Sequence, residues 1–180
     1  MKATGIVRRI DDLGRVVIPK EIRRTMRIRE GDPLEIFTDK DGELIFKKYS
    51  PIGELTDFAA QLCDSLRRSS ESIAAICDRD AVIAVAGGGK RELLDKPISA
   101  ALSDIMEKRA IYRRESAGTE LPVSGDDEGF CLSVAAPILC EGDVMGAVLF
   151  VAPRGAHTAG EVEYRLAQTA AAFLGKQMES

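Results

Sequence analysis

Short apolar segments separated by turn residues fill the first fifty positions of the chain. Residues 5–10 (GIVRRI) and 15–18 (RVVI) are typical of strands, and the Asp- and Gly-rich stretch between them predicts a hairpin turn. Pro19 follows where a helix tolerates proline, and KEIRRTM then predicts about two helical turns. Two more strands, LEIFT and ELIFKK, flank DKDG, whose Asp-Gly suits a tight turn. The predicted order is β-β-α-β-β.

This first unit is small for an independent fold. Units of about fifty residues bury little apolar surface unless a metal, disulfides or another chain stabilises them. One short helix must cover four strands here, and the unit contains neither a cysteine nor a metal motif. We therefore expect it to form a homodimer that buries its strands against a second copy.

The pattern changes at residues 51–55, where Pro51 and Gly53 interrupt the strand periodicity. We expect a first domain at residues 1–50, a linker at 51–55 and a second domain at 56–180. The second domain opens with an amphipathic helix, in which apolar residues recur at helical spacing: Leu55, Phe58, Leu62 and Leu66. The segments that follow predict the order α-β-β-α-β-β-α, which is an α+β fold with a helix at each end. The strands are expected at 72–79, 81–87, 129–140 and 142–153, and the inner helix at 96–110.

The last helix has an apolar stripe of its own. Val162, Leu166, Ala170 and either Phe173 or Leu174 recur at helical spacing. We expect part of this stripe to pack on the sheet of the same chain. A helical contact between subunits would use the rest, as in a bundle.

Charge is distributed unevenly between the two parts. Residues 1–29 contain nine Lys or Arg and three Asp or Glu, which is a formal charge of +6. The whole chain has −4, so the remainder has −10. A basic segment on an acidic protein is typical of a contact with nucleic acid or another anionic surface. Arg15, Arg23 and Arg24 are expected to have no acidic partner, because their counter-charges would be phosphates.

Motifs for catalysis and metal binding are absent. The four cysteines form no CxxC pair, and His157 is the single histidine, so zinc-ligand spacing is missing. AGGGKRELL lacks the spacing of a phosphate loop. Cys131 and Cys140 could serve redox chemistry, but their spacing of nine places them on opposite faces of a strand. We expect no enzyme, no catalytic residue, no metal and no cofactor. With no long apolar segment, we expect a cytoplasmic protein.

Residues 4–49 carry a specific pattern, TGIVR followed by DLGRVVIP and then E-RR. This stretch resembles the AbrB-type transition-state regulators of spore-forming bacteria. The order of elements after it resembles GAF domains, although no short motif certifies that likeness. The AbrB resemblance implies a swapped-hairpin barrel in which two chains interleave their strands.

The resemblance also implies a DNA-binding regulator of sporulation genes that acts as activator and repressor. Its DNA contacts would run through Arg8, Arg15, Arg23 and Arg24, with Lys2 and Arg9 as further phosphate contacts. It implies double-stranded, AT-rich targets read through DNA shape. A homodimer through the N-terminal domain and a homotetramer through the GAF-like domain are expected.

Two questions stay open at this level. The sequence leaves undecided which of Arg8 and Arg9 faces DNA, since neighbouring strand residues point to opposite sides. It also names no ligand for the GAF-like half, which could sense a small molecule or serve assembly alone. The alternative function is an antitoxin-like interaction module, against which the folded second half argues.

Overall fold

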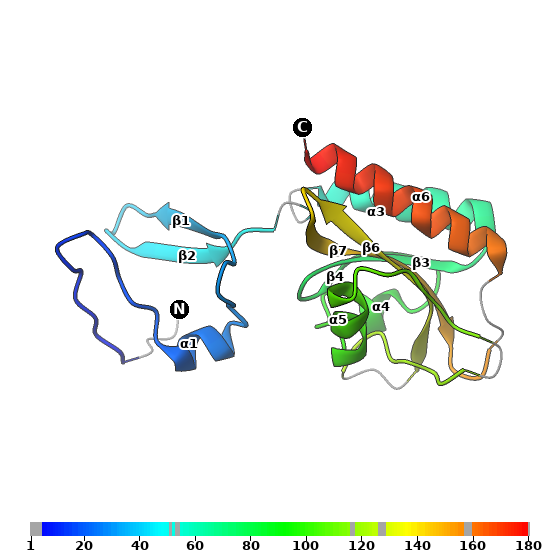
Figure 1. Ribbon diagram of the computed structural model, residues 1–180, viewed down its shortest axis with the longest axis horizontal. Coiled ribbons are helices and arrows are strands. Elements are labelled where there is room, and N and C mark those ends of the chain that lie inside the picture. Colours follow the sequence, from blue (N-terminus) through cyan, green and yellow to red (C-terminus); the bar gives the residue numbers. More distant parts are fainter. Residues whose placement is uncertain are drawn as a thin grey trace. The chain divides into compact units, whose positions relative to one another are not determined.

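The structure is a computed structural model that describes every residue except 1–4, 51, 53–54, 116–117, 126–128, 157–159 and 180. The chain separates into two compact units, Met1–Tyr49 and Ser50–Ser180 (Figure 1). None of the helices in the described residues combines the length and the apolar character needed to cross a bilayer.

The first unit contains one helix and one β-hairpin. Helix α1 spans Lys20–Thr25, strand β1 spans Leu34–Thr38 and strand β2 spans Leu44–Lys48. The two strands are antiparallel, with Ile36 opposite Phe46. These three elements confirm the prediction for residues 20–48 to within about one residue at each end.

Residues 5–10 and 15–18, predicted as strands that interleave with those of a second copy, form no strand within the single chain. A strand is defined by its ladder of hydrogen bonds to a neighbouring strand, and neither sheet of the described residues includes these segments. Their apolar side chains stay in solvent: Val7 is 90% exposed and Val17 71%.

The second unit is built on a five-stranded antiparallel sheet of order β4-β3-β7-β6-β5. The strands β6 and β7 form a long hairpin whose two turn residues, Glu141 and Gly142, both have positive φ, as a type I′ hairpin turn requires. The predicted strands are confirmed. Their bounds are β3 Ile73–Asp78, β4 Val82–Ala86, β6 Phe130–Cys140 and β7 Asp143–Pro153; a further short strand, β5 Tyr112–Arg113, lies at one edge of the sheet.

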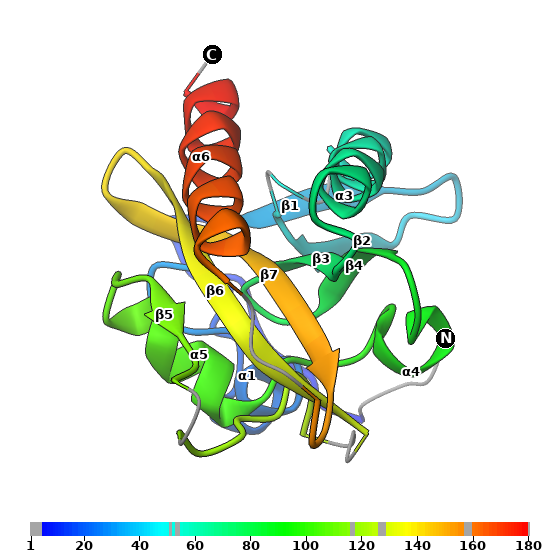
Figure 2. The same ribbon diagram turned by 90° about the vertical axis from the view of Figure 1, so that its right-hand side faces the viewer.

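Helices cover both faces of this sheet (Figure 2). The two end helices, α3 (Thr56–Ser70) and α6 (Glu161–Met178), lie side by side on one face, and α4 (Lys90–Leu93) and α5 (Ala100–Glu107) lie on the other. Alternate residues of β6 enter the two apolar layers, with Ala136 facing α6 and Ala135 facing α5. Helix α4 and strand β5 were not predicted, since elements of four and two residues are too short to show a period.

The predicted apolar stripe of α6 is confirmed in part, since Ala170 and Leu174 are buried. The residues that pack on the sheet are small ones, together with Leu174: Ala167, Ala170, Ala171 and Gly175. A Cβ on Gly175 would lie 2.1 Å from the carbonyl oxygen of Leu139, so the helix backbone approaches β6 closely. Val162 and Phe173, the other members of the predicted stripe, are exposed on the outer side.

Candidate nucleic-acid interface

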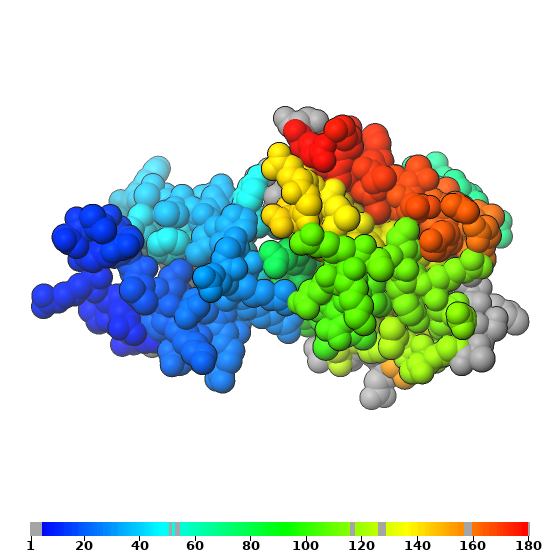
Figure 3. Space-filling view, in the orientation of Figure 1, coloured from blue at the N-terminus to red at the C-terminus, as the bar shows by residue number. Residues whose placement is uncertain are grey.

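The basic side chains of the first unit lie in solvent. Arg8 and Arg9 belong to segment 5–10, which forms no strand in the single chain, and both are exposed. In Figure 3 the first described residues, in dark blue, stand out from the rest of the unit as a narrow ridge. Lys2, also expected to contact DNA, lies outside the described residues. No acidic side chain of the described residues pairs with either arginine, so their charge is available to an anion.

A compact turn follows this segment, and Asp11 organises it. The backbone N–H of Asp11 donates to the carbonyl of Arg15 (3.0 Å), and Gly14 N–H donates to the carbonyl of Asp11 (3.0 Å). Asp11 Oδ1 accepts the N–H groups of Leu13 (3.0 Å) and Arg15 (2.7 Å). Gly14 has φ of 74°, which glycine adopts without steric cost. The predicted hairpin turn therefore forms although the segments beside it are not strands in the single chain.

Arg15 has an acidic partner, contrary to the expectation that it would have none. Its Nε donates to Asp11 Oδ2 at 2.9 Å, and its side chain is still 70% exposed. The pKa of Asp11 is lowered, first by the backbone N–H of Arg15 and further by the guanidinium. The signal in the sequence was an Asp four residues before an Arg across a Gly turn, since an Asp in a turn commonly accepts nearby backbone N–H groups.

Arg23 and Arg24 lie in the last turn of α1, and both are exposed. The helix ends in a Schellman motif: Ile28 N–H donates to the Arg23 carbonyl (2.7 Å) and Arg27 N–H to the Arg24 carbonyl (3.3 Å). Arg27 has φ of 52° there, a position that usually favours glycine. The main chain of both arginines is thus fixed, and their side chains have no acidic partner among the described residues.

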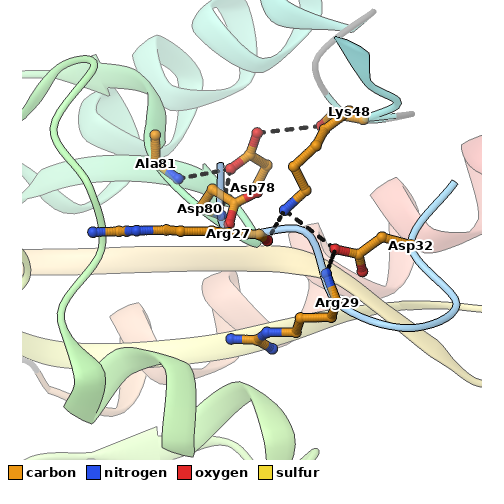
Figure 4. Close-up of polar contacts among 8 residues, drawn as sticks. Arg27, Arg29, Asp32, Lys48, Asp78, Asp80 and Ala81 are labelled. Carbon is orange, nitrogen blue, oxygen red and sulfur yellow. Dashed lines mark hydrogen bonds and ion pairs between the residues drawn. The ribbon is translucent and has the colours of Figure 1, made fainter. Parts of the chain in front are cut away.

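The end of α1 is also tied to the hairpin by Lys48, which sequence reasoning missed. Lys48 Nζ donates to the Arg27 carbonyl at 3.0 Å and lies 3.4 Å from Asp32 Oδ2 (Figure 4). Asp32 Oδ2 also accepts Arg29 N–H at 2.8 Å, and its side chain is 3% exposed. A lysine at the end of a strand gives no sequence signal for such a contact, because the helix end becomes its neighbour only after folding.

The cysteines lie in the second unit and are free and buried. Burial raises the pKa of the Cys63 and Cys77 thiols to about 12, so both are protonated at neutral pH. Burial also raises the pKa of Cys131, although the Arg114 guanidinium beside it acts in the opposite direction. The described residues contain no group of three or more His, Cys, Asp or Glu placed to hold a metal ion.

Two family models match the chain. The model described as stage V sporulation protein T C-terminal, transcription factor, matches residues 54–179. The model described as antidote-toxin recognition MazE, bacterial antitoxin, matches residues 7–54. A full-length relative, stage V sporulation protein T of Bacillus subtilis (strain 168), is 54% identical over 179 residues, which is 99% of both chains.

Solved structures match each unit separately. The N-terminal DNA recognition domain of the Bacillus subtilis regulator AbrB is 63% identical and covers 28% of this chain and 94% of its own, with a TM-score of 0.25. The GAF domain of a phosphoenolpyruvate-protein phosphotransferase from Coxiella burnetii is 16% identical, covers 69% of this chain and 82% of its own, and has a TM-score of 0.50. The GAF-like fold of the second unit is thereby confirmed.

Proposed function

We propose that this chain, which belongs to the stage V sporulation protein T family, acts through the exposed arginines of its first unit. The protein is a DNA-binding regulator of transcription in sporulation. One observation carries this assignment: Arg8, Arg23 and Arg24 are exposed and have no acidic partner among the described residues. They lie in a unit that is 63% identical to a DNA recognition domain.

We propose that Arg8, Arg15, Arg23 and Arg24 contact double-stranded DNA, with Lys2 and Arg9 adding phosphate contacts. Guanidinium groups suit this role because their planar donors match phosphate and base-edge acceptors. We expect AT-rich duplexes to bind best, because a narrow minor groove strengthens the negative potential that attracts arginine. Both activation and repression would follow from where the protein binds relative to a promoter.

The direct test is a variant with all four arginines changed to alanine, measured by fluorescence anisotropy on an AT-rich duplex. We expect specific and nonspecific binding both to weaken by more than a hundredfold at low salt, since phosphate contacts dominate the affinity. Circular dichroism of the same variant should match the wild type, because all four side chains are exposed. Unchanged binding by this variant would refute the assignment.

We propose that the first unit is a homodimer. Its exposed apolar side chains support this, since a soluble chain rarely leaves Val7, Ile10, Leu13 and Val17 in water without a partner. The turn already joins Asp11 and Arg15 by a backbone hydrogen bond, as a hairpin turn would, so the flanking segments need only neighbours to become strands. A second copy of the same unit can supply them, in the interleaved manner of a swapped hairpin.

We propose that the second unit joins two such dimers into a tetramer. Phe58 of α3 and Phe173 of α6 form an aromatic pair with centroids 5.9 Å apart on the outer side of the two helices, and Val162 is exposed on the same helix as Phe173. Linking two DNA-binding dimers raises affinity through effective concentration. The mass of Phe173→Asp by light scattering tests this: we expect a dimer where the wild type is a tetramer, and an unchanged mass would refute it.

An antitoxin-like interaction module is the alternative function, and the match of residues 7–54 to an antitoxin model favours it. In that case the first unit would bind a toxin as well as DNA. A folded GAF-like unit occupies the place where a flexible toxin-binding tail would be needed. Co-purification of a specific toxin with the full chain would support this alternative.

A further inference from the structure

Asp11 is more than a turn residue, because it also holds the side chain of Arg15. We propose that Asp11 is a positioning residue that presents Arg15 to DNA for a two-point contact, and so sets sequence discrimination. This inference rests on the proposed function, namely that Arg15 contacts DNA. It concerns a residue of opposite charge to DNA, which a search for basic residues alone passes over.

The geometry of the contact is what suggests the role. Asp11 Oδ2 accepts a hydrogen bond from Arg15 Nε at 2.9 Å, and no other described residue bonds to the guanidinium. The two terminal nitrogens are therefore left for a ligand, and the side chain is 70% exposed. Two parallel N–H donors match a phosphate or the O6 and N7 acceptors of guanine. A guanidinium held along one edge can present the other edge in a fixed orientation.

Asp11 is itself well fixed. Its Oδ1 accepts two backbone N–H groups of the turn, while its Oδ2 faces Arg15. An exposed arginine on its own loses rotamer freedom when it binds, which weakens binding. An arginine already ordered by a fixed carboxylate loses less. The gain is specific to contacts that need orientation, because attraction to a phosphate requires only proximity.

A second turn in the same unit shows that the ion pair is not needed to make the turn. Asp39 forms the same four bonds: its N–H to the Glu43 carbonyl (3.2 Å), Gly42 N–H to its carbonyl (3.4 Å), and Asp41 and Glu43 N–H to its Oδ1 (both 3.0 Å). The residue at the position of Arg15 is Glu43, which cannot form the pair. The turn thus folds with or without an arginine, and the Asp11–Arg15 contact is an addition to it.

The experiment compares Asp11→Asn with Asp39→Asn in the full chain. Both variants keep an amide oxygen for the turn and both remove one negative charge, but only Asp11→Asn turns an N–H group toward the Arg15 Nε. Affinity is measured by fluorescence anisotropy for an AT-rich target selected from random duplexes by the wild type, and for a scrambled duplex. We expect the ratio of the two affinities to fall about tenfold in Asp11→Asn, as for loss of one oriented base contact, and to stay constant in Asp39→Asn.

A third and fourth variant separate this inference from the proposed function. Arg15→Lys keeps the positive charge but loses the two parallel N–H donors of the guanidinium. The double variant Asp11→Asn/Arg15→Lys should discriminate between the two duplexes no worse than Arg15→Lys alone, because the two residues act as one unit. Equal ratios in Asp11→Asn and Asp39→Asn, or additive losses in the double variant, would overturn the positioning role. If Arg15→Ala also bound both duplexes like the wild type, the proposed DNA contact of Arg15 would itself be wrong.

Discussion

Replacing Arg23 and Arg24 together gives a prediction whose size follows from the structure. Both side chains are exposed in the last turn of α1 and have no acidic partner among the described residues, so each is free to replace one counterion at a phosphate. The slope of log affinity against log salt is about −0.9 per phosphate contact. A proposed dimer would lose four contacts in Arg23→Ala/Arg24→Ala, so its slope should become shallower by about 3.6.

The effect is large enough to measure directly. Raising the salt concentration from 50 to 200 mM should weaken DNA binding by the wild type about 150-fold more than binding by Arg23→Ala/Arg24→Ala, because the slopes differ by about 3.6. Fluorescence anisotropy of one labelled duplex at four or five salt concentrations gives both slopes. The matched control is Arg67→Ala/Arg68→Ala, which removes two basic residues from the last turn of α3 in the second unit. Parallel salt plots for the wild type and Arg23→Ala/Arg24→Ala would refute the reasoning, as would an equal change in the control.

Two further predictions concern the second unit. A Cβ at position 146 would lie 2.0 Å from the Cys77 carbonyl oxygen. Gly146→Ala should therefore lower the free energy of unfolding of that unit by roughly 3 kcal/mol or more in a urea titration, because of overpacking. Gly125→Ala, with open space around the added Cβ, should leave that free energy unchanged. The pKa of Glu120 is lowered, first by the Gly155 N–H and also by Arg114. The Glu120 carboxylate therefore stabilises the folded state at pH values above the pKa of an unfolded glutamate, and this stabilisation is lost as pH falls through the lower folded-state pKa. Stability measured from neutral pH to below about pH 4 should therefore fall less steeply in Glu120→Gln than in the wild type; identical pH profiles would contradict this.

Local patterns were enough to predict most elements of this fold. The Asp-Gly turns, the proline before α1 and the alternation in β6 and β7 all act through neighbours in the sequence, so their effects are visible without a structure. The segments at 5–10 and 15–18 show the limit of that reasoning. Their composition is typical of strands, but pairing needs a neighbour that the single chain does not supply.

The helix faces show a second limit. Hydrophobic periodicity could not tell which residues of the stripe pack on the sheet. The small residues Ala171 and Gly175 pack there because β6 approaches the helix backbone closely, whereas Val162 and Phe173 do not. Close approach depends on the distance between layers, which periodicity does not report. The large residues excluded from this contact are then left for another surface, which is the basis of the proposed tetramer.

The candidate site was partly predictable for the same reason. The basic segment is visible in the composition, and the resemblance to AbrB-type regulators then selected Arg8, Arg15, Arg23 and Arg24 without a structure. The partner of Arg15 and the contact from Lys48 to the end of α1 could not, because they depend on which backbone groups the folded turn and helix bring within reach.

Hydrogen–deuterium exchange of the full chain, with and without an AT-rich duplex, tests the central claim most directly. If the first unit binds DNA through its arginines, slowed exchange should be concentrated in peptides that cover residues 5–26, and the strands β3, β6 and β7 of the second unit should exchange as before. Protection confined to residues 56–180, with none at residues 5–26, would contradict the account.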